Sequence, residues 1–182
     1  LEPLRKLQSK QKKQKVKQYN PVIIYLEGNH EERLKRYIDN DPTFEGFVDI
    51  RKDLALDERG IEWIDYRSYR YIGGIGFTHI PFGKAKEIGG LDITRKAQAV
   101  MVDSCVFGHT HEQHMSNVHK QGMEHLQQTY NCGCFFEEHE DYVKGRMTNY
   151  WKGLTLLHNW QDSRFDVETY ALTRLEELYG ET

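Results

Sequence analysis

The sequence has few cysteines and no long apolar run. None of its 182 residues belongs to a stretch approaching the roughly 18 consecutive apolar residues that a membrane span needs, and no signal-peptide pattern opens the chain. Cysteine occurs only at Cys105, Cys132 and Cys134, and the last two are too close in sequence for an unstrained disulfide bond. We therefore expect no disulfide framework, no membrane partner and a cytoplasmic location.

Hydrophobic residues are also scarce. They make up 38% of the chain, which is low for a globular protein, whereas aromatic residues reach 12%. That aromatic content is far from a disordered composition. The length suffices for one domain with a core and is too short for two well-developed ones. We expect residues 1–182 to form a single domain with a very polar surface.

Positive charge is concentrated at the start of the chain. Residues 1–20 carry seven basic side chains and one acidic side chain, although the whole chain has a net charge of −3. The segment is rich in helix formers, so we predict a basic, mostly solvated helix that ends before Asn20-Pro21. A basic helix face can bind nucleic acid. An ordinary solvated surface is the favoured alternative, because no aromatic residues interleave with the charges.

Two histidine-containing motifs follow segments that are predicted to be strands. The run 22–26 is short, apolar and β-branched, which is typical of a fully buried strand, and Gly-Asn-His-Glu follows at 28–31. The apolar run 101–107 precedes Gly-His-Thr-His at 108–111. Between them, the strand-like segment 75–80 carries His79 near its end.

The remaining pattern predicts an α/β fold class. Helices are expected at 32–40, 93–100 and 171–178, and further strands at 61–66, 69–72, 125–130, 151–159 and 164–170. One strand and helix crossover is thus followed by a mainly antiparallel second half.

The side chains at these strand ends suit metal binding. Ligand sites on open α/β sheets gather at the carboxyl ends of the strands, so the three loops are expected to converge. His109 and His111 stand two residues apart on a tight loop, and can therefore reach two neighbouring ions rather than chelate one. Imidazole nitrogen suits zinc, iron or manganese, and the side-chain oxygen of Asn29 shifts the balance toward harder ions. Such ions favour phosphoryl transfer, because they neutralise phosphate charge and lower the pKa of a bound water.

With both tetrapeptides in this order and His79 between them, the sequence resembles the calcineurin-like metallophosphoesterase superfamily. The resemblance runs from residue 22 to about residue 134, where Asn-Cys-Gly-Cys at 131–134 looks like the family's Asn-x-Gly-Ser turn. It implies a four-layer α/β/β/α sandwich with two divalent metal ions, manganese first, with zinc, iron or nickel as alternatives. It also implies hydrolysis of a phosphomonoester or phosphodiester by a metal-bound hydroxide.

The same resemblance assigns roles to individual residues. Asn29, His79 and His109 would bind one ion, and His111 the other. His30 resembles the family's catalytic histidine, which contacts the phosphate and protonates the leaving oxygen. Arg33, one helical turn beyond His30, would bind the anionic substrate; the alternative is an ordinary arginine on a helix surface.

The chain departs from the family pattern in three places. Ile80 follows His79 where the family usually has glycine. Leu26-Glu27 precedes the first motif where protein serine/threonine phosphatases have arginine, which favours phosphodiester substrates, nucleic acid among them. The upstream motifs Asp-x-His and Gly-Asp-x-x-Asp, which supply most ligands of the first ion and the bridging carboxylate, occur nowhere in the sequence.

Two expectations follow from the missing motifs. The native protein would extend upstream of Leu1, and this chain alone would show weak hydrolytic activity or none. The rival interpretation is a non-catalytic scaffold that binds nucleic acid or a partner through its basic helix.

Other reactive side chains are interpreted as ordinary surface or core residues. Cys132 and Cys134 lack a second cysteine pair, so we interpret them as small residues at a strand end. The acidic segment 137–141 is interpreted as a solvated loop. The histidines set aside in the same way are His114, His119, His125, His139 and His158.

Overall fold

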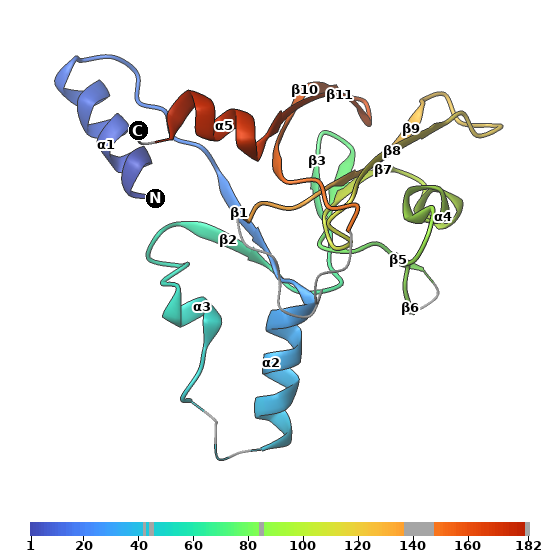
Figure 1. Ribbon diagram of the computed structural model, residues 1–182, viewed down its shortest axis with the longest axis horizontal. Coiled ribbons are helices and arrows are strands. Elements are labelled where there is room, and N and C mark those ends of the chain that lie inside the picture. Colours follow the sequence, from blue (N-terminus) through green and yellow to red (C-terminus); the bar gives the residue numbers. More distant parts are fainter. Residues whose placement is uncertain (42, 44–45, 84–85, 137–147, 181–182) are drawn as a thin grey trace.

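The computed structural model of the chain has a mixed α/β architecture (Figure 1) and describes residues 1–41, 43, 46–83, 86–136 and 148–180. The described helices are α1 (Glu2–Lys13), α2 (Asn29–Asn40), α3 (Ile50–Asp53), α4 (Ile93–Val100) and α5 (Leu172–Tyr179). The described strands are β1 (Ile23–Leu26), β2 (Ile61–Ile64), β3 (Arg70–Ile72), β4 (Ile75–Phe77), β5 (Phe82–Gly83), β6 (Lys86–Glu87), β7 (Ser104–Phe107), β8 (Gln113–Val118), β9 (Gln127–Cys132), β10 (Gly153–Gln161) and β11 (Arg164–Ala171). None of the described helices is both long and apolar enough to cross a membrane.

The largest sheet has five strands in the order β3-β4-β7-β9-β8. Strands β4, β7 and β9 run parallel, while β3 and β8 pair antiparallel at the two edges. All four residues of β7 are buried, as expected for a central strand of β-prone residues. The parallel pairing places the carboxyl ends of β4 and β7 side by side, and Gly108 N–H donates to the carbonyl of His79 at 3.3 Å.

Both faces of this sheet are covered. On one face, Ile75, Val106 and Tyr130 pack with Phe165 of β11, so the antiparallel hairpin β10-β11 forms a second layer. On the other face, Ile93 of α4 packs with residues of β7. The five-stranded sheet therefore lies between a hairpin and a helix.

A separate parallel pair, β1 and β2, carries the first motif. Tyr25 and Trp63 stack across the pair with ring centroids 5.0 Å apart. The prediction of a fully buried first strand is wrong, because all four β1 residues are half-buried. In the part of the chain that the structure describes, β1 has β2 as its single neighbour, so one edge of β1 is not covered by another strand.

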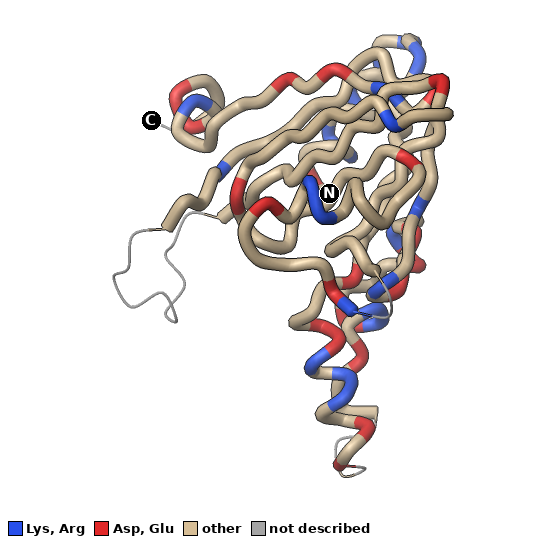
Figure 2. Tube along the Cα trace, turned by 90° about the vertical axis from the view of Figure 1, so that its right-hand side faces the viewer, with Lys and Arg blue, Asp and Glu red and all other residues tan. Residues whose placement is uncertain are grey.

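Helix α2 begins earlier than predicted, at Asn29, because Gly28 forms its N-cap. The helix projects from the foot of the molecule, with basic and acidic residues interspersed along it (Figure 2). The predicted helices at 93–100 and 171–178 correspond to α4 and α5. The short helix α3 and strand β8 were not predicted from the sequence.

The basic helix at the start of the chain is shorter than predicted. It ends at Lys13 instead of continuing toward Asn20. Lys15 adopts a left-handed backbone with φ 55°, and the chain then folds back so that Tyr19 N–H donates to the side chain of Gln11. A left-handed residue cannot continue a right-handed helix, which explains the early end. No residue of α1 is buried.

Cys105, Cys132 and Cys134 are not joined to one another by disulfide bonds. Burial raises the pKa of the Cys132 thiol, and the Cys134 thiol donates to the carbonyl of Trp151. The acidic segment 137–141, with His139, lies outside the described residues.

Candidate metal centre

Three side chains from separate loops meet at one point. Nε2 of His79 lies 3.1 Å from Oδ1 of Asn29 and 3.0 Å from Nδ1 of His109. Asn29 opens α2, His79 follows β4, and His109 follows β7. The two imidazole rings stand nearly perpendicular, at 76°, with their centroids 5.0 Å apart. The structure thus brings together the three residues that the family resemblance assigns to one ion.

Gly28 makes this approach sterically feasible. Its N–H donates to Oε2 of Glu31 at 2.9 Å, and Oε1 of Glu31 accepts from the hydroxyl of Tyr25 at 3.0 Å. These bonds cap α2 and fix the start of the helix beside the strand. A Cβ atom at Gly28 would lie only 3.1 Å from Cε1 of His79, so a larger residue would push the ring away.

The loop at 108–111 is held at both ends. Asn131, which is fully buried at the end of β9, donates its side-chain N–H to the hydroxyl of Thr110. The carbonyl of His111 accepts from the N–H of Trp151 at 2.9 Å. His111 has a left-handed backbone with φ 62°, which is uncommon for a residue other than glycine and recurs at functional sites.

Burial sets the charge state of the two central histidines. Desolvation, with a smaller contribution from the neighbouring His109, lowers the pKa of His79 to about 4. Desolvation is also the main cause of the lowered pKa of His109. Both rings are therefore neutral at neutral pH, the state in which imidazole binds a metal.

An open cavity of about 890 Å³ surrounds this cluster. All six residues predicted as site residues line it, namely Asn29, His30, Arg33, His79, His109 and His111. The His30 and Arg33 side chains are exposed on the first two turns of α2, and Nε of Arg33 donates to the carbonyl of Asn29 at 3.3 Å.

Four further residues line the cavity that were not predicted as site residues: Gly28, Glu31, Thr110 and Tyr150. The ring of His111 packs edge-on against Tyr150 at 4.8 Å and against Phe136 at 5.4 Å. Three of these belong to the two histidine-containing motifs, namely Gly28, Glu31 and Thr110, so membership of a motif was the signal that could have identified them. Tyr150 reaches the cavity through a backbone bridge with Glu112, and no local pattern signals that pairing.

The donor set is compatible with a transition metal. The described part of the chain contains no cluster of three or more histidine, cysteine or carboxylate side chains arranged to hold an ion. The group here instead joins two imidazoles and one amide oxygen, whose atoms are 3.0 and 3.1 Å apart. Ligands about 2.1 Å from one ion stand roughly 3.0 to 3.4 Å from one another, depending on the bond angle. The two distances from His79 Nε2, to Asn29 Oδ1 and to His109 Nδ1, therefore match the ligand spacing of a mixed nitrogen and oxygen site.

Comparison of the chain with known proteins finds no matching family model, no matching curated protein and no matching solved structure.

Proposed function

We propose that the chain is a metal-dependent phosphoesterase of the calcineurin-like superfamily. The observation that carries the proposal is the meeting of Asn29, His79 and His109 within 3.1 Å, in a cavity that His30, Arg33 and His111 also line. The layering of α4, the five-stranded sheet and the β10-β11 hairpin is compatible with part of the α/β/β/α sandwich that we propose as its complete fold.

The residues divide into an ion-binding group and a substrate-binding group. Asn29, His79 and His109 would hold a divalent ion, with His111 directed to a second one. When bound, such ions neutralise phosphate charge and bring the pKa of a bound water toward neutrality. The neutral state of His79 and His109 leaves their nitrogen lone pairs available at neutral pH.

His30 and Arg33 act on the substrate from the first two turns of α2. The N-terminus of a 12-residue helix favours an anion, so a phosphate in the cavity is attracted to this end. His30 in its protonated form donates its proton to the leaving oxygen while the bond from phosphorus to that oxygen breaks. Arg33 donates N–H bonds to the remaining phosphate oxygens. Phosphodiesters, including nucleic acid, are the proposed substrate class.

Metal binding tests the first half of this proposal. Titration calorimetry with manganese or zinc should show stoichiometric binding by the wild-type chain and at least about tenfold weaker binding by His79→Ala and His109→Ala. His158→Ala is the matched control, because that exposed histidine pairs with Glu168 on the β10-β11 hairpin. Equal affinity in all four proteins would show that the histidine cluster holds no ion.

Hydrolysis tests the second half. With manganese and bis-(p-nitrophenyl) phosphate, His30→Gln should lower kcat by about 100-fold or more, because it removes the proton donor. Metal content should not change, since His30 is outside the three-donor group. A wild-type chain that binds metal but hydrolyses no phosphoester, alone or extended upstream, would refute the enzymatic role.

The alternative is a non-catalytic scaffold that binds nucleic acid through α1. Its support is that no residue of α1 is buried while the last turn carries Lys10, Lys12 and Lys13. Deleting residues 1–18 should then abolish salt-sensitive DNA binding. An unchanged affinity after the deletion rules out this role for α1.

A further inference from the structure

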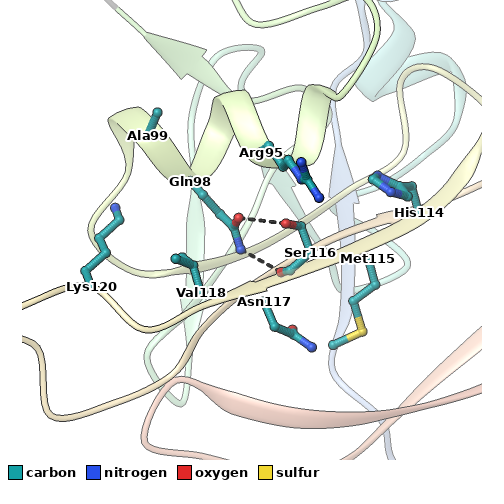
Figure 3. A pocket seen from close by; sticks show the side chains of 9 residues that line it. All are labelled: Arg95, Gln98, Ala99, His114, Met115, Ser116, Asn117, Val118 and Lys120. Carbon is teal, nitrogen blue, oxygen red and sulfur yellow. Dashed lines mark hydrogen bonds between the residues drawn. The ribbon is translucent and has the colours of Figure 1, made fainter.

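A second hollow lies between α4 and the edge strand β8 (Figure 3). Its volume is about 570 Å³. Arg95, Gln98 and Ala99 line it from the helix, and the strand supplies the opposite wall from His114 onward. We call this hollow the α4–β8 groove. It is on the opposite side of the molecule from α1 (Figure 1), so the basic helix does not contribute to it.

The α4–β8 groove is positively charged in a chain whose net charge is negative. Arg95, Lys120 and His114 line it, and its described lining contains no carboxylate. The chain as a whole has a net charge of −3, so a wall without any acidic residue departs from its average surface. A concave surface of one sign concentrates counter-ions of the other, which indicates an anionic ligand.

Hydrogen bonds between helix and strand fix the floor of the groove. Nε2 of Gln98 donates to the carbonyl of Ser116 at 2.6 Å, and the Ser116 hydroxyl donates back to Oε1 of Gln98 at 2.8 Å (Figure 3). At one end, Nζ of Lys120 donates to the carbonyl of Met101 at 2.6 Å. A ligand would therefore meet a preformed surface, which lowers the entropy cost of binding.

Two donors remain available toward this surface. The guanidinium of Arg95 makes no hydrogen bond or ion pair within the described residues, and Figure 3 shows it on the His114 side of the groove. Nδ1 of His114 lies 2.7 Å from the hydroxyl of the buried Thr94. When Thr94 donates this bond, the ring proton of neutral His114 is on Nε2, and His114 can donate it to an anion.

A short stretch of chain joins the groove to the candidate metal centre. His114 follows His111 by three residues, so their Cα atoms are at most about 11 Å apart. Glu112 lies between them but does not line the groove. A nucleic-acid strand carries a phosphate about every 3.4 Å along the helix axis. A strand with one phosphate at the metal centre would thus present others near His114, on whose side of the groove Arg95 lies (Figure 3).

We propose that the α4–β8 groove is a second phosphate subsite, in which Arg95 and His114 hold the backbone of a nucleic-acid strand whose reacting phosphate occupies the metal centre. This subsite rests on the proposed phosphoesterase function and adds the requirement of an extended phosphodiester substrate. The described lining contains no Phe, Tyr or Trp, so the groove holds phosphates and does not stack bases. Binding there is independent of base sequence and weakens with salt.

Fluorescence anisotropy with a labelled 20-nucleotide oligothymidylate tests this subsite without catalysis, in EDTA and across a salt series. Arg95→Ala should raise Kd at least about fivefold and reduce the salt slope by about 1. Arg95→Glu should weaken binding further. The matched control is Lys96→Ala on the same helix, because Lys96 lies outside the groove and donates to the carbonyl of Gly89. The control should change Kd less than twofold.

The possible outcomes separate the subsite from the proposed function. Equal weakening by the Arg95 and Lys96 variants, or no oligonucleotide binding by the wild-type chain, overturns the subsite. A selective Arg95 effect in a chain that hydrolyses no phosphoester leaves the subsite standing and refutes the enzyme. If the chain hydrolyses bis-(p-nitrophenyl) phosphate but Arg95→Ala has no selective effect on oligonucleotide binding, the proposed enzyme stands and the subsite is refuted.

Discussion

A methyl group at Gly28 would disturb the helix cap and the candidate metal centre together. The Cβ atom of alanine would lie 2.7 Å from Oε2 of Glu31 and 3.1 Å from Cε1 of His79. The Glu31 carboxylate cannot move away freely, because it accepts bonds from Gly28 N–H and from the Tyr25 hydroxyl. The backbone at Gly28 is extended, with φ −95°, so alanine suits it and the conflict is steric.

The expected cost of Gly28→Ala follows from these two contacts. Overpacking a closely packed site costs about 1 to 3 kcal/mol, and losing the cap hydrogen bond costs about 0.5 to 1.5 kcal/mol. The same movement of Glu31 relieves part of the clash, so the two costs overlap. We expect the free energy of unfolding to fall by roughly 1 to 3 kcal/mol. Displacement of the His79 ring should also weaken metal binding by about 10- to 100-fold.

Urea denaturation in EDTA measures the first effect, and manganese titration measures the second. Gly89→Ala is the matched control, because nothing lies within 4 Å of its added Cβ and its φ is not left-handed. The control should change the free energy of unfolding by less than about 0.5 kcal/mol. Wild-type stability and metal affinity in Gly28→Ala would refute the close approach of His79 to the cap of α2.

Two other substitutions probe the supports of the site. Asn131→Ala removes the hydrogen bond to Thr110 and leaves a small cavity. In urea denaturation it should lower the free energy of unfolding by about 1 to 3 kcal/mol, and it should also weaken manganese binding. Unchanged stability and manganese affinity would show that Asn131 does not hold the loop at 108–111. The pKa of His79 is lowered from 6.5 to about 4, so the unfolded chain takes up the proton first as the pH falls. Stability of the metal-free chain is therefore full above pH 6.5 and decreases toward pH 4, by about 1 to 2 kcal/mol for a half-buried ring. His79→Gln should flatten this part of the pH profile in urea denaturation. An identical profile in the wild-type chain and in His79→Gln would contradict the view that the lowered pKa of His79 causes the loss of stability.

The sequence was sufficient to predict which loops converge. Periodicity places strands before the motif at 108–111 and before His79, and the carboxyl ends of parallel strands lie at one edge of a sheet. The pairing of β4 with β7 supplies that edge. The helix at 93–100 was equally clear, since apolar residues at helical spacing give α4 the face that packs on the sheet.

Elements that depend on distant pairing could not be predicted in the same way. Strand β8 is polar, with only Met115 and Val118 as apolar residues, and it forms because β9 pairs with it. Tyr150 reaches the cavity through a bridge to Glu112, which is 38 residues away in the sequence. The half-burial of β1 likewise depends on its neighbours and not on its own apolar residues.

The surroundings of His111 differ from those of the other donors, and this difference bears on how many ions the chain binds. His79 Nε2 lies 3.1 Å from the Asn29 oxygen and 3.0 Å from a His109 nitrogen, whereas the His111 ring packs edge-on against Tyr150 and Phe136. Ring carbons are not metal ligands, and an ion held by one imidazole is weakly bound. The three-donor group should therefore bind its ion first and most tightly. Any second ion near His111 depends on further oxygen or nitrogen ligands, from the substrate phosphate or from other parts of the protein.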